Sequence, residues 1–239
     1  INYIGEEINL GEIRKSFYSL YPGNWSIKLA DFGDINPGKT VDDTYEVVRS
    51  IISYFIKNDV IPVIIGGSQD LTYANYRAYD DFKKTINIVN VDSNFDLGDS
   101  SKPIKNNSYL GKIILEEPHN LFNYATLGYQ TYYNPQIEID LMEKLYFEAY
   151  RLGEVCNNIT SVEPVMRDAD IVTIDLRCIK SSELSSRQKL SPNGFDGKEI
   201  CSISRYAGIS NKVSSFGIFE YRSSNEDEIT EMLIAQILW

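Results

Sequence analysis

The sequence predicts an α/β protein of three layers, in which helices cover both faces of a mostly parallel sheet. Short apolar runs alternate along the chain with segments that repeat apolar residues at helical spacing. These runs are nearly continuous, as expected of strands that are buried on both faces. Polar and acidic residues directly follow several of the runs, at the carboxyl ends of the expected strands, where an open α/β sheet binds its ligands. Together these observations favour a parallel sheet sandwiched between helices.

The N-terminal half begins this alternation. Residues 25–30 form a strand-like run, and Thr40 then begins a helix, because Asp42 and Asp43 fall in its first turn and suit the helix dipole. Apolar residues recur through this helix at steps of four and three: Val41, Tyr45, Val48, Ile52 and Phe55. The next expected elements are a strand at 60–65, a helix at 71–82, a strand at 86–91 and a short helix at 108–116.

The C-terminal half repeats the same pattern. The expected strands are 122–129, 147–152, 170–176 and 212–221, and the expected helices are 137–145, 153–167, 197–207 and 226–239. No internal repeat, low-complexity tract or linker composition interrupts the chain. We therefore expect one domain that spans residues 1–239.

Charge and composition limit the classes of partner. The chain carries 34 acidic and 23 basic residues, a net charge of −11, which argues against nucleic acid or an anionic membrane as partner. No apolar run approaches the ~20 residues that span a bilayer, and no signal-peptide pattern is evident. A soluble cytoplasmic protein is therefore expected. Cys156, Cys178 and Cys201 form no C-x-x-C pair and are expected to be buried, inert thiols.

Polar residues gather at the predicted carboxyl ends of four strands. The set comprises Gly66, Gly67, Ser68, Gln69 and Asp70, then Asp92, Asn94, Asp96 and Asp99, then Asp175 and Arg177, and finally Glu220. Because the carboxyl ends of parallel strands meet at one edge of the sheet, these residues are expected to share one cleft.

Several chemistries compete for this cleft. The stretch Asp92–Asp96 begins like a calcium loop but lacks the glycine and the acid that an EF-hand needs at its sixth and twelfth positions. A looser Mg²⁺ or Ca²⁺ site from Asp92, Asn94, Asp96 and Asp175 stays open. Nucleophilic triads would depend on His119, the only histidine, which precedes a strand and is expected at the surface. No phosphate-binding glycine motif is present.

The same strand-end residues carry a resemblance to a known family. The chain resembles the ureohydrolase superfamily of arginase, agmatinase and formimidoylglutamase over nearly its whole length, and is most similar to the formimidoylglutamase branch. The resemblance implies an arginase-like sheet of about eight strands, including one near residue 1. In that family two Mn²⁺ ions and a bridging hydroxide attack a guanidinium or formimino carbon.

The metal motifs of that family are altered here. The family pattern Gly-Gly-Asp-His-Ser is Gly66-Gly67-Ser68-Gln69-Asp70, so that Gln69 replaces a histidine ligand. The pattern Asp-Ala-His-x-Asp keeps Asp92 and Asp96 but has Asn94 for its histidine. The pattern Asp-x-Asp keeps Asp175 and has Arg177 for its second acid. By resemblance, Glu220 matches the glutamate that receives the substrate's guanidinium group.

These changes predict the loss of the dimanganese site. Neutral amides are weak ligands for Mn²⁺, and a guanidinium cannot be neutralised. Residues two apart on a strand face the same way, so Arg177 is expected to lie among Asp92, Asp96 and Asp175 and to hold their pKa values low. No cofactor is then expected. Manganese is expected only under the alternative that the site still binds metal.

The favoured interpretation is a ureohydrolase-fold pseudoenzyme that acts as a binding, scaffold or assembly protein. The alternative is a hydrolase of C–N bonds in linear amidines, like formimidoylglutamase or agmatinase, with an altered or single-metal site. A small amidine or guanidine ligand bound through Glu220, or a protein partner, fits either interpretation. By resemblance alone, a homo-oligomer is also considered, and a purely structural subunit of a larger assembly is a third hypothesis.

Overall fold

The computed structural model describes residues 8–24, 26–99, 101–185, 191–223 and 228–239. Its centre is a six-stranded sheet in the order β1-β6-β5-β2-β3-β4, with every adjacent pair parallel. The strands are β1 (Val63–Ile65), β2 (Ile86–Val91), β3 (Leu121–Tyr129), β4 (Glu148–Arg151), β5 (Ile171–Asp175) and β6 (Ser215–Phe219). The predicted three-layer α/β fold is confirmed, with six strands in the described residues rather than about eight.

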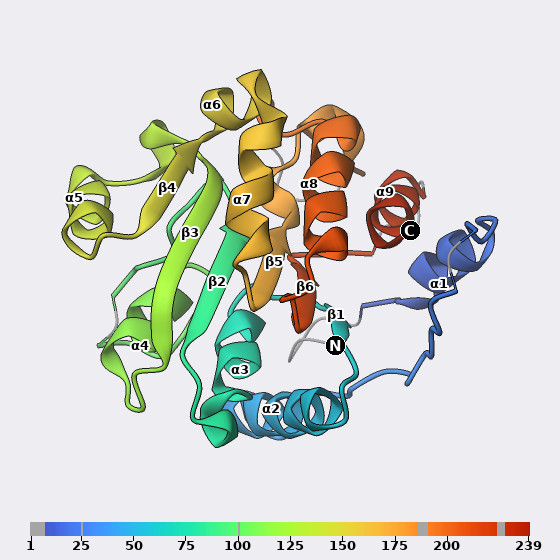
Figure 1. The fold of residues 1–239 in the computed structure, drawn as a ribbon, viewed down its shortest axis with the longest axis horizontal. Coiled ribbons are helices and arrows are strands. Elements are labelled where there is room, and N and C mark those ends of the chain that lie inside the picture. Colours follow the sequence, from blue (N-terminus) through green and yellow to red (C-terminus); the bar gives the residue numbers. More distant parts are fainter. Residues whose placement is uncertain (1–7, 25, 100, 186–190, 224–227) are drawn as a thin grey trace.

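Helices cover both faces of this sheet (Figure 1). One face packs against α1 (Gly11–Tyr18), α6 (Leu152–Asn157), α7 (Val162–Arg167), α8 (Gly197–Ile209) and α9 (Ile229–Leu238). The other packs against α2 (Val41–Lys57), α3 (Leu71–Arg77), α4 (Tyr109–Leu115) and α5 (Gln136–Lys144). Along β2, Val89 and Val91 enter the first core while Ile86 and Ile88 enter the second. This period of two explains why the strand is apolar throughout.

The two expected strands that do not appear among the described residues were both placed near the N-terminus. Residues 26–30 have no regular structure, and Ile27 and Leu29 are exposed, so the expected strand at 25–30 is wrong for the described part. Trp25 and the strand expected near residue 1 lie outside the described residues. The alternation of apolar residues at 27 and 29 satisfied strand periodicity, but in the described residues this segment pairs with no strand. Helix α1, which the pattern did not indicate, packs beside α9 instead (Figure 1).

Helix boundaries follow local chemistry more closely. At the start of α2, the Thr40 side chain accepts a hydrogen bond from the Asp43 amide and the Asp43 side chain accepts one from the Thr40 amide, a complete capping box. The helix expected at 153–167 is divided, because Asn158 leaves helical geometry between α6 and the 3-10 turn Ile159–Ser161 that precedes α7. Residues 226 and 227 of the expected final helix lie outside the described residues.

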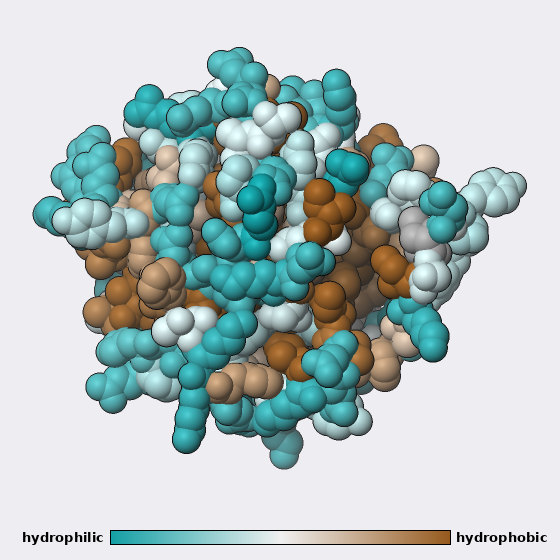
Figure 2. Space-filling model, in the orientation of Figure 1, coloured by the Kyte–Doolittle hydropathy of each residue, from teal (hydrophilic) through white to brown (hydrophobic). Residues whose placement is uncertain are grey.

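The face of the molecule shown in Figure 2 is largely polar. Hydrophilic residues cover most of the face shown in Figure 2, and hydrophobic residues gather toward α8, α9 and α1. His119 is exposed, on the loop before β3, as the sequence suggested. All three cysteines are free, with Cys178 buried and Cys156 and Cys201 half-buried. None of the helices within the described ranges has the length and hydropathy that a membrane span requires.

Candidate functional site: a buried carboxylate cluster

The candidate site lies where the direction of the sheet order changes. From β2 the chain continues outward through β3 and β4, and it then returns to the other side of β2 to add β5 and β6. The carboxyl ends of β2 and β5 therefore border a switch point, where open α/β sheets bind ligands. Asp92 follows β2, and Asp175 ends β5. Asp96, on the loop after β2, completes a group whose carboxylate oxygens lie within 4.8 Å of one another.

Arg177 supplies a cation to this group. Its Nε lies 3.0 and 2.9 Å from the two oxygens of Asp175, its terminal nitrogen also bonds that carboxylate, and its side chain is only 15% exposed. The sequence analysis expected this position because residues two apart on a strand face the same way. That reason is wrong, because β5 ends at Asp175 and Arg177 lies in a 3-10 turn. The Asp175 side chain caps that turn by accepting the Arg177 amide at 2.7 Å. The turn folds the guanidinium back onto the strand end.

Asp92 and Asp96 have no such partner. Both are buried, and neither oxygen of Asp96 accepts a hydrogen bond from any described donor. Burial, followed by repulsion from Asp175, raises the pKa of Asp92 to about 7. Burial, and next the negative charge of Asp92, raise the pKa of Asp96 well above its ordinary value. The expectation that Arg177 would hold these pKa values low is therefore wrong, because one cation, paired closely with Asp175, does not offset the burial of the other two acids.

A network of neutral side chains surrounds the acids. The Gln69 side-chain amide donates to Asn90 Oδ1 at 3.0 Å, Thr173 donates to the same oxygen at 2.7 Å, and Asn90 Nδ2 lies 3.3 Å from Asp92. Asn90 and Thr173 are register partners on β2 and β5. The sequence analysis missed both, although a polar residue at matching places in two apolar runs was the available signal. Gln69 thus lies at the site, but its side-chain amide donates its protons to Asn90 and, at 3.5 Å, to the Tyr109 hydroxyl.

Glu220 lies beside Arg177 and is also buried. The Glu220 backbone amide donates to the Gly67 carbonyl. One Glu220 carboxylate oxygen accepts hydrogen bonds from the Gln69 backbone amide at 2.9 Å and from the Asn106 side-chain amide at 3.1 Å. The other oxygen lies 3.8 Å from Arg177 Nε. Burial, followed by Asp175, raises the pKa of Glu220. Its φ of 61° is in the left-handed region, which costs a non-glycine residue free energy, and Asp96 shares this conformation with a φ of 56°.

Three other residues from the sequence prediction lie outside the cluster. Asn94 donates its side-chain amide to the Tyr133 carbonyl at 3.2 Å and accepts from Ser93. Asp99 forms an exposed ion pair with Lys102. Asp70 is buried, but its carboxylate bonds the Tyr45 hydroxyl on α2. The cluster therefore contains fewer of the strand-end residues than their sequence positions suggested.

The fold and this site define a class of protein, an arginase-like α/β fold with an acidic site at the ends of its central strands. The chain belongs to the Arginase family, whose model matches residues 6–239. The expected similarity to formimidoylglutamases is confirmed. A formimidoylglutamase of Staphylococcus aureus (strain MSSA476) is 24% identical over 246 residues, covering 98% of this chain and 78% of that relative.

Solved structures share the fold. Formiminoglutamase of Trypanosoma cruzi with Mn²⁺ superposes with a TM-score of 0.84 at 17% identity, covering 98% of this chain and 86% of that one. Formimidoylglutamase of Bacillus subtilis gives 0.82 at 18%, with 95% and 77% covered. Agmatine ureohydrolase of Thermoplasma volcanium gives 0.79 at 19%, with 95% and 79% covered. At these identities the likeness establishes the architecture alone.

The residues present do not fit a two-manganese centre. Three carboxylates converge, but Arg177 already binds Asp175, and Gln69 directs its amide protons to Asn90 and Tyr109. A guanidinium cannot be deprotonated to make room for a metal ion. A single hard cation is a closer match, because Asp92, Asp96 and Asp175 bring three carboxylate oxygens within 4.8 Å of one another. Such an ion would compete with Arg177 for Asp175.

Proposed function

We propose that this chain is an arginase-fold pseudoenzyme in whose buried carboxylate cluster Arg177 binds Asp175, and that it acts as a binding or scaffold protein. The observation that carries the proposal is the guanidinium itself, bonded to Asp175 and 3.8 Å from Glu220. A fixed positive charge at this point would repel a pair of divalent cations and cannot supply hydroxide.

A second candidate has support of its own. The chain is similar to formimidoylglutamases, and Asp92, Asp96 and Asp175 hold three oxygens within 4.8 Å. If Arg177 moves off Asp175, these acids would hold one hard cation, which would supply Lewis-acid polarisation of a C–N centre bound there. Glu220 would receive the amidinium group. The chain would then be a hydrolase of C–N bonds in linear amidines with an altered metal site.

Metal content and turnover separate the two candidates. For the pseudoenzyme we expect no stoichiometric manganese by elemental analysis, and no urea or formamide released from arginine, agmatine or formiminoglutamate. About two manganese ions per chain, or turnover in the usual enzymatic range of roughly 1–10³ s⁻¹, would contradict this proposal.

Arg177 itself offers a sharper test. If its guanidinium takes the place of a metal ion, then Arg177→Gln should bind Mn²⁺ or Mg²⁺ at least about tenfold more tightly than the parent, by calorimetry. Arg177→Lys keeps a positive charge and is the matched control, so it should gain little. Equal affinity in all three proteins would mean that Arg177 does not compete with cations at this site.

Ligand binding by Glu220 is testable in the same way. One Glu220 oxygen is held by Gln69 and Asn106, and the other faces Arg177, so an amidine or guanidine ligand would displace the internal guanidinium. A calorimetric screen of guanidines and amines should give at least one binder whose heat is lost in Glu220→Gln. The hypothesis fails if no compound binds, or if the variant binds as well as the parent.

A further inference from the structure

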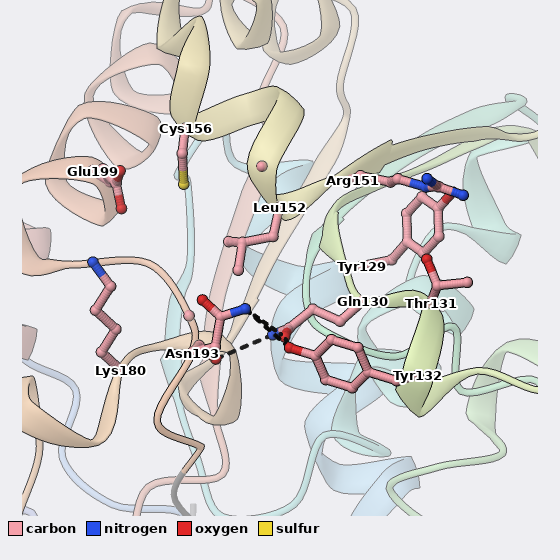
Figure 3. A pocket seen from close by; sticks show the side chains of 12 residues that line it. Tyr129, Gln130, Thr131, Tyr132, Arg151, Leu152, Cys156, Lys180, Asn193 and Glu199 are labelled. Carbon is pink, nitrogen blue, oxygen red and sulfur yellow. Dashed lines mark hydrogen bonds between the residues drawn. The ribbon is translucent and has the colours of Figure 1, made fainter.

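A cavity of about 400 Å³ lies between the end of β3, the start of α6 and the loops around Lys180 and Asn193 (Figure 3). The head groups of Arg151 and Lys180 are directed away from each other there, so its two cations do not converge on one ligand. The described residues that line this cavity include neither Glu220 nor Asn106. A ligand for Glu220 therefore needs a different entrance.

A surface segment, residues 101–107, lies over Glu220 and is here called the strap. Its residues are exposed, apart from the half-buried Ile104 and Asn106. Among the described residues, the backbone of the strap forms hydrogen bonds only within residues 99–108, for example from the Lys102 amide to the Asp99 carbonyl at 3.2 Å. A segment with few buried contacts and a solvated backbone opens at a low cost in free energy.

The C-terminal end of the strap is fixed to the body of the protein. Gly98 has a φ of 46°, and a Cβ at this position would lie 2.5 Å from the Asn107 carbonyl oxygen. The Leu110 amide, at the start of α4, donates to the Asp96 carbonyl at 3.2 Å. The strap can therefore open from this fixed end without a change in α4.

Two side chains hold the strap onto the protein. Ile104 packs against the core on the α2–α5 side of the sheet, and the Asn106 side-chain amide donates to one Glu220 oxygen at 3.1 Å. Lys102 pairs instead with the nearby Asp99, where both side chains are exposed. A hydrogen bond to a carboxylate is stronger than one between neutral groups. Asn106 is therefore the polar contact that keeps the strap closed.

The two oxygens of Glu220 have different neighbours. One accepts hydrogen bonds from the Gln69 backbone amide and from Asn106, and the other lies 3.8 Å from Arg177 Nε. A planar guanidinium binds a carboxylate through two parallel hydrogen bonds and so requires both oxygens. Such a ligand would displace Asn106 as well as Arg177. An ammonium is a compact point charge that needs only one oxygen, and it can bind while Asn106 stays in place.

We infer that Asn106 is a releasable latch, which holds the strap over Glu220 and is displaced by ligands with a planar, two-pronged cationic group. This inference rests on the ligand site at Glu220 proposed above, and it adds the step that admits a ligand to that site. Asn106 thereby sets a preference for the shape of the cation, because only a two-pronged group competes with it.

Proteolysis tests the latch without any ligand. Lys102 precedes Pro103, which blocks trypsin, so Lys105 is the tryptic site of the strap. Asn106→Ala should speed cleavage after Lys105 at least about tenfold, because it removes a hydrogen bond to a charged group. Each rate is divided by that of a synthetic peptide with the same sequence, which corrects for the substitution beside the cleaved bond.

Asn107→Ala is the matched control. Asn107 is an exposed neighbour on the same strap, and its side chain forms no hydrogen bond among the described residues, so its cleavage rate should equal that of the parent. Equal rates in the parent and in Asn106→Ala would overturn the latch.

Calorimetry with methylguanidine and methylamine tests the shape preference. Asn106→Ala should bind methylguanidine at least about tenfold more tightly than the parent does, because one competing donor is gone, and should bind methylamine with unchanged affinity. An equal gain for both compounds, or no gain for methylguanidine, would overturn the inference while leaving the ligand site at Glu220 in place. If methylguanidine binds neither protein, the ligand site and its shape preference both fail, and the trypsin rates alone decide the latch.

Discussion

Two arginines of this protein pair with aspartates in opposite surroundings. Arg14 donates to Asp31 at 2.7 Å and to Asp34 at 2.6 Å on the surface near α1, where these side chains are 31% to 41% exposed. Arg177 binds Asp175 in the interior, where the acid is fully buried. At the surface, Arg14 and then the Gly33 amide lower the pKa of Asp31 to about 2. In the interior, burial raises the pKa of Asp92 to about 7 although Arg177 is close.

The comparison shows that the loss of water around buried acids shifts their pKa more than a neighbouring cation does, when the acids outnumber the cation. Asp31 stays hydrated, so its partner only adds favourable charge. Asp92 and Asp96 lose their water and also face Asp175, so the neutral form is favoured despite Arg177. The buried cluster is therefore a place where one added or removed charge has a large effect, and the surface pair is one where it has little.

The largest expected effect is that of removing the buried cation. Arg177→Ala should lower the free energy of unfolding at pH 7 by about 3–5 kcal/mol, because it leaves Asp175 buried without its partner. Urea denaturation of the parent and the variant measures the loss. Arg177→Lys keeps the charge but not the two-pronged geometry, and should fall between them. A loss below about 0.5 kcal/mol would show that Asp175 is neutralised in another way.

The next effect is on the pH dependence of stability. Asp92 has a folded pKa of about 7, and an unfolded aspartate titrates near about 3.9, so between these values the folded state binds more protons. This contribution therefore favours the folded state at about pH 4 and is lost as pH rises toward about 7. For Asp31 the pH dependence of stability has the opposite sign. Its lowered pKa stabilises the folded state above about pH 3.9, and this stabilisation is lost as the pH falls through about 2.

Asp92→Asn isolates that contribution. Asparagine removes one buried acid without a large change of shape, so the variant should gain stability relative to the parent at about pH 8 and lose that advantage near about pH 5.5. Urea midpoints of both proteins at the two pH values decide the matter. A constant difference between the proteins would mean that Asp92 does not titrate in this range.

The smallest expected effect is at the surface. Arg14→Ala should cost less than about 1 kcal/mol, because hydrated ion pairs gain little and lose side-chain entropy. The cost should shrink further in high salt, which screens exposed charges. If Arg14→Ala is as damaging as Arg177→Ala in the same urea experiment, then burial is not what distinguishes the two pairs.

Local patterns were sufficient for much of the architecture. Period-two apolar runs such as 86–91 are strands because both faces are buried, and the Thr40–Asp43 pair begins a helix because it satisfies free amides at that end. The motif order around Gln69, Asp92 and Asp175 was enough to indicate the family, which the match over residues 6–239 confirms. These features depend on neighbours in sequence, or on the single requirement that parallel strands end at one edge.

The tertiary structure decided the rest. It left residues 26–30 without strand partners, turned Arg177 back through a 3-10 helix, and aligned Asn90 with Thr173 beside Asp92. It also reversed the expected direction of the Asp92 and Asp96 pKa shifts, because the sequence shows which charges are present but not how much water each retains. The sequence by itself determined the fold class and the family, and it pointed to the strand ends at which Asp92, Asp96 and Asp175 converge. Burial, which depends on the packed whole, decided their charge.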